Sequence, residues 1–266
     1  MGRLNTAVSL QEMFERGSGR HWCESAASSH EHSVFAEPVN TFSSLWIAVI
    51  NLIWIAFDTF YIKQVRPSVL WVYAAVMFVS ASSAYFHATL SLFAQLLDEL
   101  GLVWTATAIF VIWLPGFEDG AKLRHGPQLR AAFVCLGLIY TGLCFLKPQL
   151  NAFLLMSSTV LIVTSMLREQ ALVHAPKALR LLSILAFITG GAAVFAWLSE
   201  ELACGLLQRI GFPYLHGIWH VLSGCTAHFS LLFYAFSDAW KQGLAPRLVW
   251  VAHVYPYLYI KPRSYQ

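Results

Sequence analysis

Apolar residues in this chain occur in long runs, and short polar or Pro- and Gly-containing breaks separate the runs. A helix needs about 20 mostly apolar residues to cross a bilayer. The pattern therefore predicts an all-α membrane protein with seven transmembrane helices, preceded by a polar segment, 1–40, and followed by a segment, 238–266. The predicted helices span residues 41–62, 68–90, 92–114, 129–146, 149–167, 179–198 and 213–236.

The second and third predicted helices form a single apolar run of about 47 residues, which would be ~70 Å long as one helix. That is about twice the thickness of a hydrocarbon core, so the run must fold back once. The most polar place for the reversal is residues 89–91, with the sequence TLS. Pro115, Pro148 and Pro213 mark other breaks between the runs.

Composition agrees with a membrane protein. Hydrophobic residues make up 58% of the chain and charged residues 12%, whereas soluble domains average about 25% charged residues. The net charge of +3 is too small to indicate nucleic-acid binding. We expect membrane lipids as partners, no nucleic acid, and no obligate protein partner.

The distribution of Lys and Arg predicts the orientation. With the N-terminus on the outer (lumenal) side, twelve of the 17 basic residues fall in cytosolic segments and five in lumenal ones. Cytosolic loops are enriched in Lys and Arg, so the N-terminus is predicted to be lumenal and the C-terminus cytosolic. Asp58, near the cytosolic end of the first helix, is expected to snorkel toward the headgroups.

Ionisable side chains within the predicted helices cluster at one depth. They are His87 on the second helix, Asp98 on the third, and His216 and His220 on the seventh. Such residues are costly in a membrane and mark functional sites. His216 and His220 are four residues apart and share a helical face. With His87 they could hold one zinc ion and leave its fourth position open, which is the arrangement of catalytic zinc.

The same cluster offers two assisting groups. Asp98 could accept a proton from water and pass it to a leaving group. Ser83, one turn before His87, could stabilise an oxyanion. The region 41–237 would then be a catalytic domain, between a lumenal tail, 1–40, and a cytosolic tail, 238–266.

Each of these residues also has a structural interpretation. A single His in a membrane helix more often forms a hydrogen bond between helices than binds a metal, and Ser83 lies in a run of small residues typical of close helix packing. Glu99 points about 100° away from Asp98. His228 lies two turns beyond His220 and is expected to be a buried polar group of the core. Three imidazoles and a carboxylate at one depth favour the metal.

Several motifs resemble the alkaline ceramidases, a family within a wider superfamily of seven-helix membrane hydrolases that includes the adiponectin receptors. The resemblance runs in order from about residue 22 to residue 237. It is carried by SAYFHATLS at 83–91, QLLDEL at 95–100, FPYLHGIWH at 212–220, WCE at 22–24, EPVNT at 37–41, and Lys147-Pro148 with Asn151-Ala152.

The resemblance implies hydrolysis of the N-acyl bond of ceramide, with release of sphingosine and a fatty acid, in a membrane of the endoplasmic reticulum or Golgi. It implies zinc on His87, His216 and His220, assisted by Asp98 and Ser83. Acyl-chain preference, sphingoid-base preference, pH optimum and oligomeric state do not follow from it.

The resemblance also implies a calcium ion held by the tail, through the carbonyl of Trp22 and the carboxylates of Glu24 and Glu37. Here the sequence departs from the family pattern, because His21 replaces the usual Asp and Ala26 stands where an Asn is usual. Glu31 or water could fill the gap. Glu24 and Glu37 could instead be ordinary solvated residues, so a weakened calcium site is expected.

A disulfide is expected between Cys23 and Cys204. The other cysteines, Cys135, Cys144 and Cys225, fall within predicted helices. Cys23 lies in the tail and Cys204 in the loop between the sixth and seventh helices, both on the predicted oxidising side. Members of the family that this chain resembles have both cysteines.

Three other functions compete with hydrolysis. A receptor of the adiponectin-receptor type is disfavoured by the short cytosolic loops. A metal transporter would need ligands spread across the membrane, and this cluster lies at one depth. A purely structural bundle would not need three imidazoles at one level.

Overall fold

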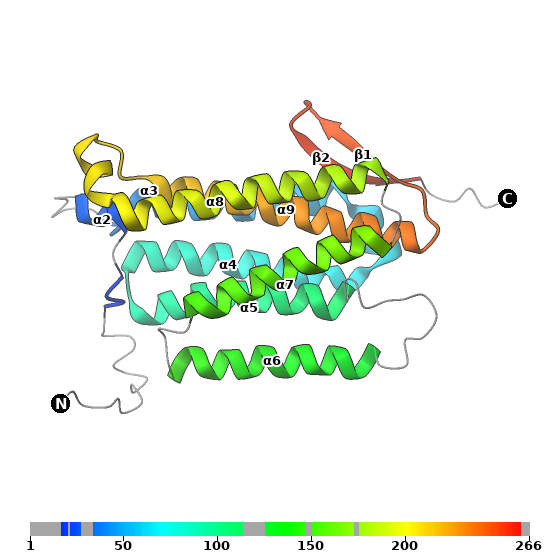
Figure 1. Cartoon of the computed structure of the whole chain (residues 1–266), viewed down its shortest axis with the longest axis horizontal. Coiled ribbons are helices and arrows are strands. Elements are labelled where there is room, and N and C mark those ends of the chain that lie inside the picture. Colours follow the sequence, from blue (N-terminus) through cyan, green and yellow to red (C-terminus); the bar gives the residue numbers. More distant parts are fainter. Residues whose placement is uncertain are drawn as a thin grey trace.

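The computed structural model describes residues 17–20, 22–27, 34–113, 126–146, 151–172 and 176–261. Long helices lie side by side along one direction, and a β-hairpin packs near one end of the bundle (Figure 1). The elements are α2 (Cys23–Ala27), α3 (Pro38–Phe57), the π-helix η1 (Tyr61–Val65), the 3₁₀ helix η2 (Pro67–Val69), α4 (Leu70–Thr89), α5 (Leu92–Trp113), α6 (Gly126–Leu146), α7 (Asn151–Leu172), α8 (Lys177–Arg209), α9 (Leu215–Lys241), β1 (Pro246–Val251) and β2 (Tyr255–Ile260).

Five helical stretches among the described residues are long and apolar enough to cross a membrane: α3, the stretch from Pro67 to Thr89, α5, α6 and α8. The chain is therefore mostly helical with several candidate membrane spans. The predicted spans 149–167 and 213–236 correspond to α7 and α9, which are helices of 22 and 27 residues but are not among these five candidate spans. Seven crossings and their orientation stay predictions.

The bundle is built around α3, α4, α8 and α9. Helix α8 packs on α9, α3 packs on both α4 and α9, α4 pairs with α5, and α6 packs against α5. The main apolar core fills the half of the bundle next to η1 and includes the fully buried side chains of Trp54, Tyr73, Leu179 and Leu232. The opposite half holds smaller apolar clusters, among them Phe86, Ala94 and Leu96, together with buried polar groups.

The chain reverses between α4 and α5 where the sequence predicted it. Helix α4 ends at Thr89, and α5 begins at Leu92. Leu90 adopts the left-handed conformation, with φ of 51°, and its N–H donates to the carbonyl of Phe86. Left-handed residues of this kind commonly end helices.

The predicted end of one helix is wrong. The sixth predicted helix does not end at residue 198, because α8 continues to Arg209 with a break at Ala203 (φ −126°, ψ 20°). Cys204 therefore lies in a helix and not in a loop. The acidic residues that interrupt the apolar run are compatible with helix, since Glu, Leu, Gln and Arg all favour it. Helix α3 begins at Pro38, a residue suited to the first turn of a helix.

The expectation of an all-α chain is wrong at the C-terminal end. Strands β1 and β2 pair antiparallel, with Pro246 opposite Ile260 and Val251 opposite Tyr255. Ala252 and His253 both have positive φ, 50° and 60°, which is typical of the tight turn of a hairpin. The strands are rich in Val, Tyr and Trp, residues that favour β-structure.

Asp58 does not snorkel into water or headgroups, which is a second correction. Its side chain is buried, with 1% exposed, and its Oδ1 accepts a hydrogen bond of 2.7 Å from the N–H of Leu258 in β2. The segment after the helix bundle thus returns and pairs with this carboxylate.

Charged side chains tie the helices together at this end. Asp238 of α9 accepts hydrogen bonds of 2.7 Å from Arg66 Nε and from the Tyr61 hydroxyl. The indole N–H of Trp113 donates to the Tyr61 oxygen at 2.7 Å. Lys241 forms an ion pair with Glu169 of α7. Each buried charge here has partners, as a water-poor environment requires.

The expected disulfide is confirmed. Cys23 and Cys204 are bonded, with their Cα atoms 5.5 Å apart, and join the tail to α8. Among the described residues, Cys135, Cys144 and Cys225 are free.

Loss of this disulfide should lower the melting temperature of the detergent-purified protein. The two cysteines are 181 residues apart in sequence, and loss of a native disulfide commonly costs about 2–5 kcal/mol. We expect Cys23→Ser and Cys204→Ser to melt several degrees below the wild type. A reductant should lower the melting temperature of the wild type to that of the two variants. Cys135→Ser, at an exposed free cysteine, is the control. A reduction-dependent gel-mobility shift that persists in Cys23→Ser would contradict this pairing.

Candidate metal centre

Three buried histidines meet between α4 and α9. His87 lies near the end of α4, and His216 and His220 lie one turn apart in the first turns of α9. One ring nitrogen from each lies within 4.8 Å of the other two, and no more than 3% of any of the three residues is exposed. The predicted gathering of these residues is confirmed, and the cluster could hold a metal ion.

Glu37, the residue before α3, fixes the orientation of His87. Its Oε2 lies 2.6 Å from Nδ1 of His87, and both side chains are fully buried. A carboxylate accepts hydrogen bonds, so Nδ1 carries the proton and Nε2 keeps its lone pair. Nε2 of His87 has no hydrogen-bond partner. A buried imidazole held in this way by a carboxylate is the arrangement of metal-binding histidines.

Ser43 of α3 does the same for His220. Its hydroxyl donates to the carbonyl of Asn40 at 3.1 Å and lies 2.8 Å from Nδ1 of His220. Because the hydroxyl proton is used on the carbonyl, the oxygen accepts from the Nδ1–H group. The lone pair of His220 Nε2 then faces the cluster, where a metal would be.

His216 is held by stacking. Its ring lies 3.6 Å from the Trp22 ring and 4.9 Å from the Trp219 ring, centroid to centroid, at interplanar angles of 21° and 17°. Its Nδ1 is buried and has no partner. Two of the three histidines therefore carry an unsatisfied buried nitrogen, which is costly unless a ligand occupies the cluster.

Ser83 and Asp98 stand beside the histidines, as predicted. The Ser83 oxygen is 3.4 Å from Nε2 of His220 and 3.1 Å from the Ser44 hydroxyl. Asp98 of α5 lies close to the Ser83 hydroxyl. The carboxylate, the hydroxyl and the three imidazoles thus form one polar group inside the bundle.

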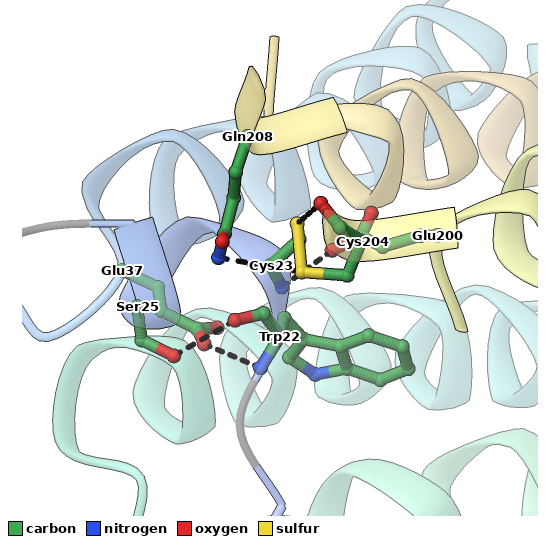
Figure 2. The surroundings of a disulfide bond; sticks show 7 residues. All are labelled: Trp22, Cys23, Ser25, Glu37, Glu200, Cys204 and Gln208. Carbon is green, nitrogen blue, oxygen red and sulfur yellow. Dashed lines mark hydrogen bonds between the residues drawn. A yellow bond between two sulfur atoms is a disulfide. The ribbon is translucent and has the colours of Figure 1, made fainter. Parts of the chain in front are cut away.

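A strap formed by residues 22–24 lies over this polar group, with the Trp22 ring stacked on His216, and Figure 2 shows how the strap is held. The N–H of Trp22 donates to Glu37 at 3.0 Å, and the N–H of Cys23 donates to Glu200 of α8 at 2.8 Å. The Cys23–Cys204 disulfide is one helical turn further along α8. The strap is therefore joined to both α3 and α8, and it places Trp22 on His216.

The tail residues predicted to bind calcium, Trp22, Glu24 and Glu37, lie together in this region. Both oxygens of Glu24 accept backbone N–H groups, from Val39 at 2.7 Å and Asn40 at 2.9 Å. The carbonyl of Trp22 accepts from the Ser25 hydroxyl at 3.0 Å. The other residues considered for this site, His21 and Glu31, are outside the described residues.

The pKa values of the two tail carboxylates, Glu24 and Glu37, shift in opposite directions. Burial raises the pKa of Glu24, although the N–H groups of Val39 and Asn40 oppose the rise. Burial also acts to raise the pKa of Glu37, but the hydrogen bond from His87 and its electrostatic attraction outweigh it, and the pKa falls below its usual value. Glu37 is therefore held as the carboxylate that the imidazole needs.

The sequence did not indicate the contacts of Ser43, Glu37 and Glu200. Glu37 was assigned to calcium only, and its contact with His87 joins residues 50 positions apart. One sequence signal could have suggested this contact. Glu37 is a carboxylate directly before α3, the helix that packs against the helix of His87.

Comparison with known proteins agrees with the geometry. The model of the ceramidase family matches residues 15–259. An alkaline ceramidase of Drosophila melanogaster is 33% identical over 231 residues, which cover 86% of this chain and 81% of that protein. An alkaline ceramidase of Caenorhabditis elegans is 31% identical over 233 residues, covering 86% and 85%. Alkaline ceramidase 1 of Homo sapiens is 31% identical over 220 residues, covering 82% of each.

Replacing Glu37 should weaken metal binding without unfolding the protein. We expect Glu37→Gln to lower the affinity for zinc by about 10–100-fold, because loss of a carboxylate behind a metal-binding histidine typically has this effect. Competition with a fluorescent zinc chelator would measure the affinity. Glu201→Gln, at an exposed carboxylate paired with Arg20, is the matched control. Equal zinc affinity in both variants would show that Glu37 does not act through His87.

Proposed function

This chain belongs to the alkaline ceramidase family and is a ceramidase, and on that premise we propose that it uses a zinc ion held by His87, His216 and His220 to hydrolyse the amide bond of ceramide. The observation that carries the proposal is the set of unsatisfied nitrogens in a closed cluster, Nε2 of His87 and Nδ1 of His216. Imidazole suits zinc, and three protein ligands leave one position open.

The residues around the cluster supply the remaining chemistry. When bound, zinc supplies Lewis acidity and a nucleophile at neutral pH. Asp98 is proposed to take a proton from the attacking water and to deliver it to the leaving amine of sphingosine. The Ser83 hydroxyl, between Asp98 and His220, is proposed to donate to the oxygen of the amide as negative charge develops on it.

Ceramide is proposed to reach the cluster from the bilayer. The substrate is a lipid with little solubility in water, and the strap covers the polar end of the bundle through Glu37, Glu200 and Cys204. Lateral entry keeps the acyl chain in lipid while the amide reaches the histidines.

We further propose that the N-terminus is lumenal, in the endoplasmic reticulum or Golgi. Two observations support this orientation. Twelve of the 17 basic residues would then be cytosolic, and the Cys23–Cys204 disulfide would lie on an oxidising side.

The alternative functions are less compatible with the site. Family membership does not favour the receptor interpretation. A metal transporter would need a second metal-binding position further along the bundle, and His228 would have to supply it. However, Nε2 of His228 donates a hydrogen bond to the carbonyl of Pro256 at 3.0 Å.

Substitution of the histidines should abolish both zinc binding and ceramide turnover. We expect less than one zinc per chain, by elemental analysis, in His87→Ala and in the double variant His216→Ala/His220→Ala. Asp98→Asn should keep its zinc and lose about 10²–10⁴-fold in rate, the typical share of general acid–base catalysis. His253→Asn, at an exposed histidine in the hairpin turn, is the control. Normal ceramide hydrolysis by the double variant would contradict the zinc proposal.

Calcium binding by the tail is also proposed, at a site that fits a cation. Three buried carboxylates, those of Glu24, Glu37 and Glu200, repel one another around the strap, and among the described residues no Lys or Arg pairs with them. The side-chain oxygen of Asn40 is buried beside them without a partner. Bound calcium would neutralise this charge. Because the oxygens of Glu24 already accept N–H groups and the usual Asp is absent, we expect weak binding.

Calcium should therefore stabilise the strap at high free concentration. We expect the melting temperature of the zinc-loaded protein to rise with buffered free calcium, less steeply in Glu24→Gln and at lower calcium in His21→Asp, which restores an anionic ligand. Magnesium, which prefers smaller octahedral sites, is the control ion. A wild-type melting temperature that does not change with calcium would contradict the proposal.

A further inference from the structure

The C-terminal hairpin packs against α3 and α9 near one end of the bundle (Figure 1). The Tyr255 hydroxyl donates to the carbonyl of Ile50 at 3.3 Å, and the Tyr255 ring stacks on His228 at 4.4 Å. Ile50 lies seven residues before the end of α3 at Phe57. At 1.5 Å per residue, the turn end of the hairpin is about 10 Å inside the end of a candidate membrane span.

The inner edge of the hairpin has its hydrogen bonds satisfied by two buried ionisable side chains. The N–H of Leu258 donates to Asp58 at 2.7 Å, and Nε2 of His228 donates to the carbonyl of Pro256 at 3.0 Å. Pro256 has no N–H to satisfy. An open strand edge is costly where water is scarce, so this pairing suits a position at membrane depth.

The outward surface of the hairpin is mostly apolar at its turn, where His253 is also exposed, and basic at its base. Val254 is 77% exposed, and Val251 and Trp250 are also exposed. The exposed basic residues of the strand region, Arg247 and Lys261, lie at the other end, where Arg247 pairs across the strands with Tyr259. In a membrane interface, apolar and aromatic side chains lie deeper and cationic side chains lie closer to the headgroups. The hairpin has the same order from its turn to its base.

This apolar surface is continuous with the surface of α3. Phe57, which is exposed, lies 5.0 Å from the Tyr257 ring, centroid to centroid. Trp46, three turns earlier on the same face of the helix, is exposed as well. Since α3 is long and apolar enough to span a bilayer, the surface that its exposed residues share with the hairpin faces lipid.

We infer that the hairpin is a bilayer-anchoring element. The turn formed by residues 251–254 inserts into the boundary between headgroups and acyl chains, and Arg247 and Lys261 contact lipid phosphates. Asp58 and His228 have the structural role of satisfying its inner edge. This role is independent of zinc and of ceramide hydrolysis.

Depth-dependent quenching would test the insertion. In a Cys135→Ser/Cys225→Ser background, Val254→Cys is labelled with the fluorophore NBD and reconstituted in phosphatidylcholine nanodiscs. Cys144 is buried and should not react. We expect lipids with a nitroxide on the acyl chain to quench the probe about twofold or more, and aqueous iodide to quench it weakly. Gln242→Cys, at an exposed position after α9, should show the opposite pattern.

Efficient quenching at Val254 by iodide, with none by the acyl-chain nitroxide, would overturn the inference. Retained ceramide turnover by the labelled protein would confirm that it is folded. If Val254→Cys does not fold, Val251→Cys in the same turn provides the same test.

Discussion

The contact between Glu37 and His87 is the interaction on which the rest of the site depends. One carboxylate that is fully buried joins three parts of the chain, because it lies directly before α3, accepts the N–H of Trp22 in the strap, and orients the imidazole on α4. The backbone reinforces it, since the N–H of Glu37 donates to the carbonyl of His87 at 3.0 Å. A buried carboxylate without such donors would be strongly destabilising, so the tail, α3 and the histidine must be arranged together.

The strap follows from the same constraint. Once Trp22 is held by Glu37, its ring lies flat on His216, and Cys23 is brought to α8, where Glu200 and Cys204 fix it. The polar end of the bundle is thereby covered by a segment that covalent and hydrogen-bonded links hold in place. A lipid substrate suits this arrangement, because a lipid enters through the side of a bundle and needs no opening toward water.

Much of the site could be predicted from the sequence, because helical spacing and depth in the bilayer are encoded locally. The i, i+4 pair His216 and His220 and the reversal at Leu90 are of this kind. The pairing of Cys23 with Cys204 was predictable for another reason, because these are the two cysteines outside the predicted helices. The contacts of Ser43 and Glu37 could not be predicted, since they join distant segments and leave no periodic signal. The hairpin could not be predicted from the search for long apolar runs, because its alternating residues are too few to form a membrane span. The burial of Asp58 could not be predicted either, because its partner, Leu258, lies 200 positions away.

Hydrogen bonding separates the functional histidines from the structural one, although all four are buried. His228 donates from Nε2 to Pro256, and its ring packs on Tyr255, so its burial is accounted for by the protein itself. His87 and His216 each keep a nitrogen that no protein group satisfies. By burial alone, all four histidines would be equally good candidates for metal ligands. The unsatisfied atoms of His87 and His216, in one cluster with His220, are what favour a bound ion there and a scaffold role for His228.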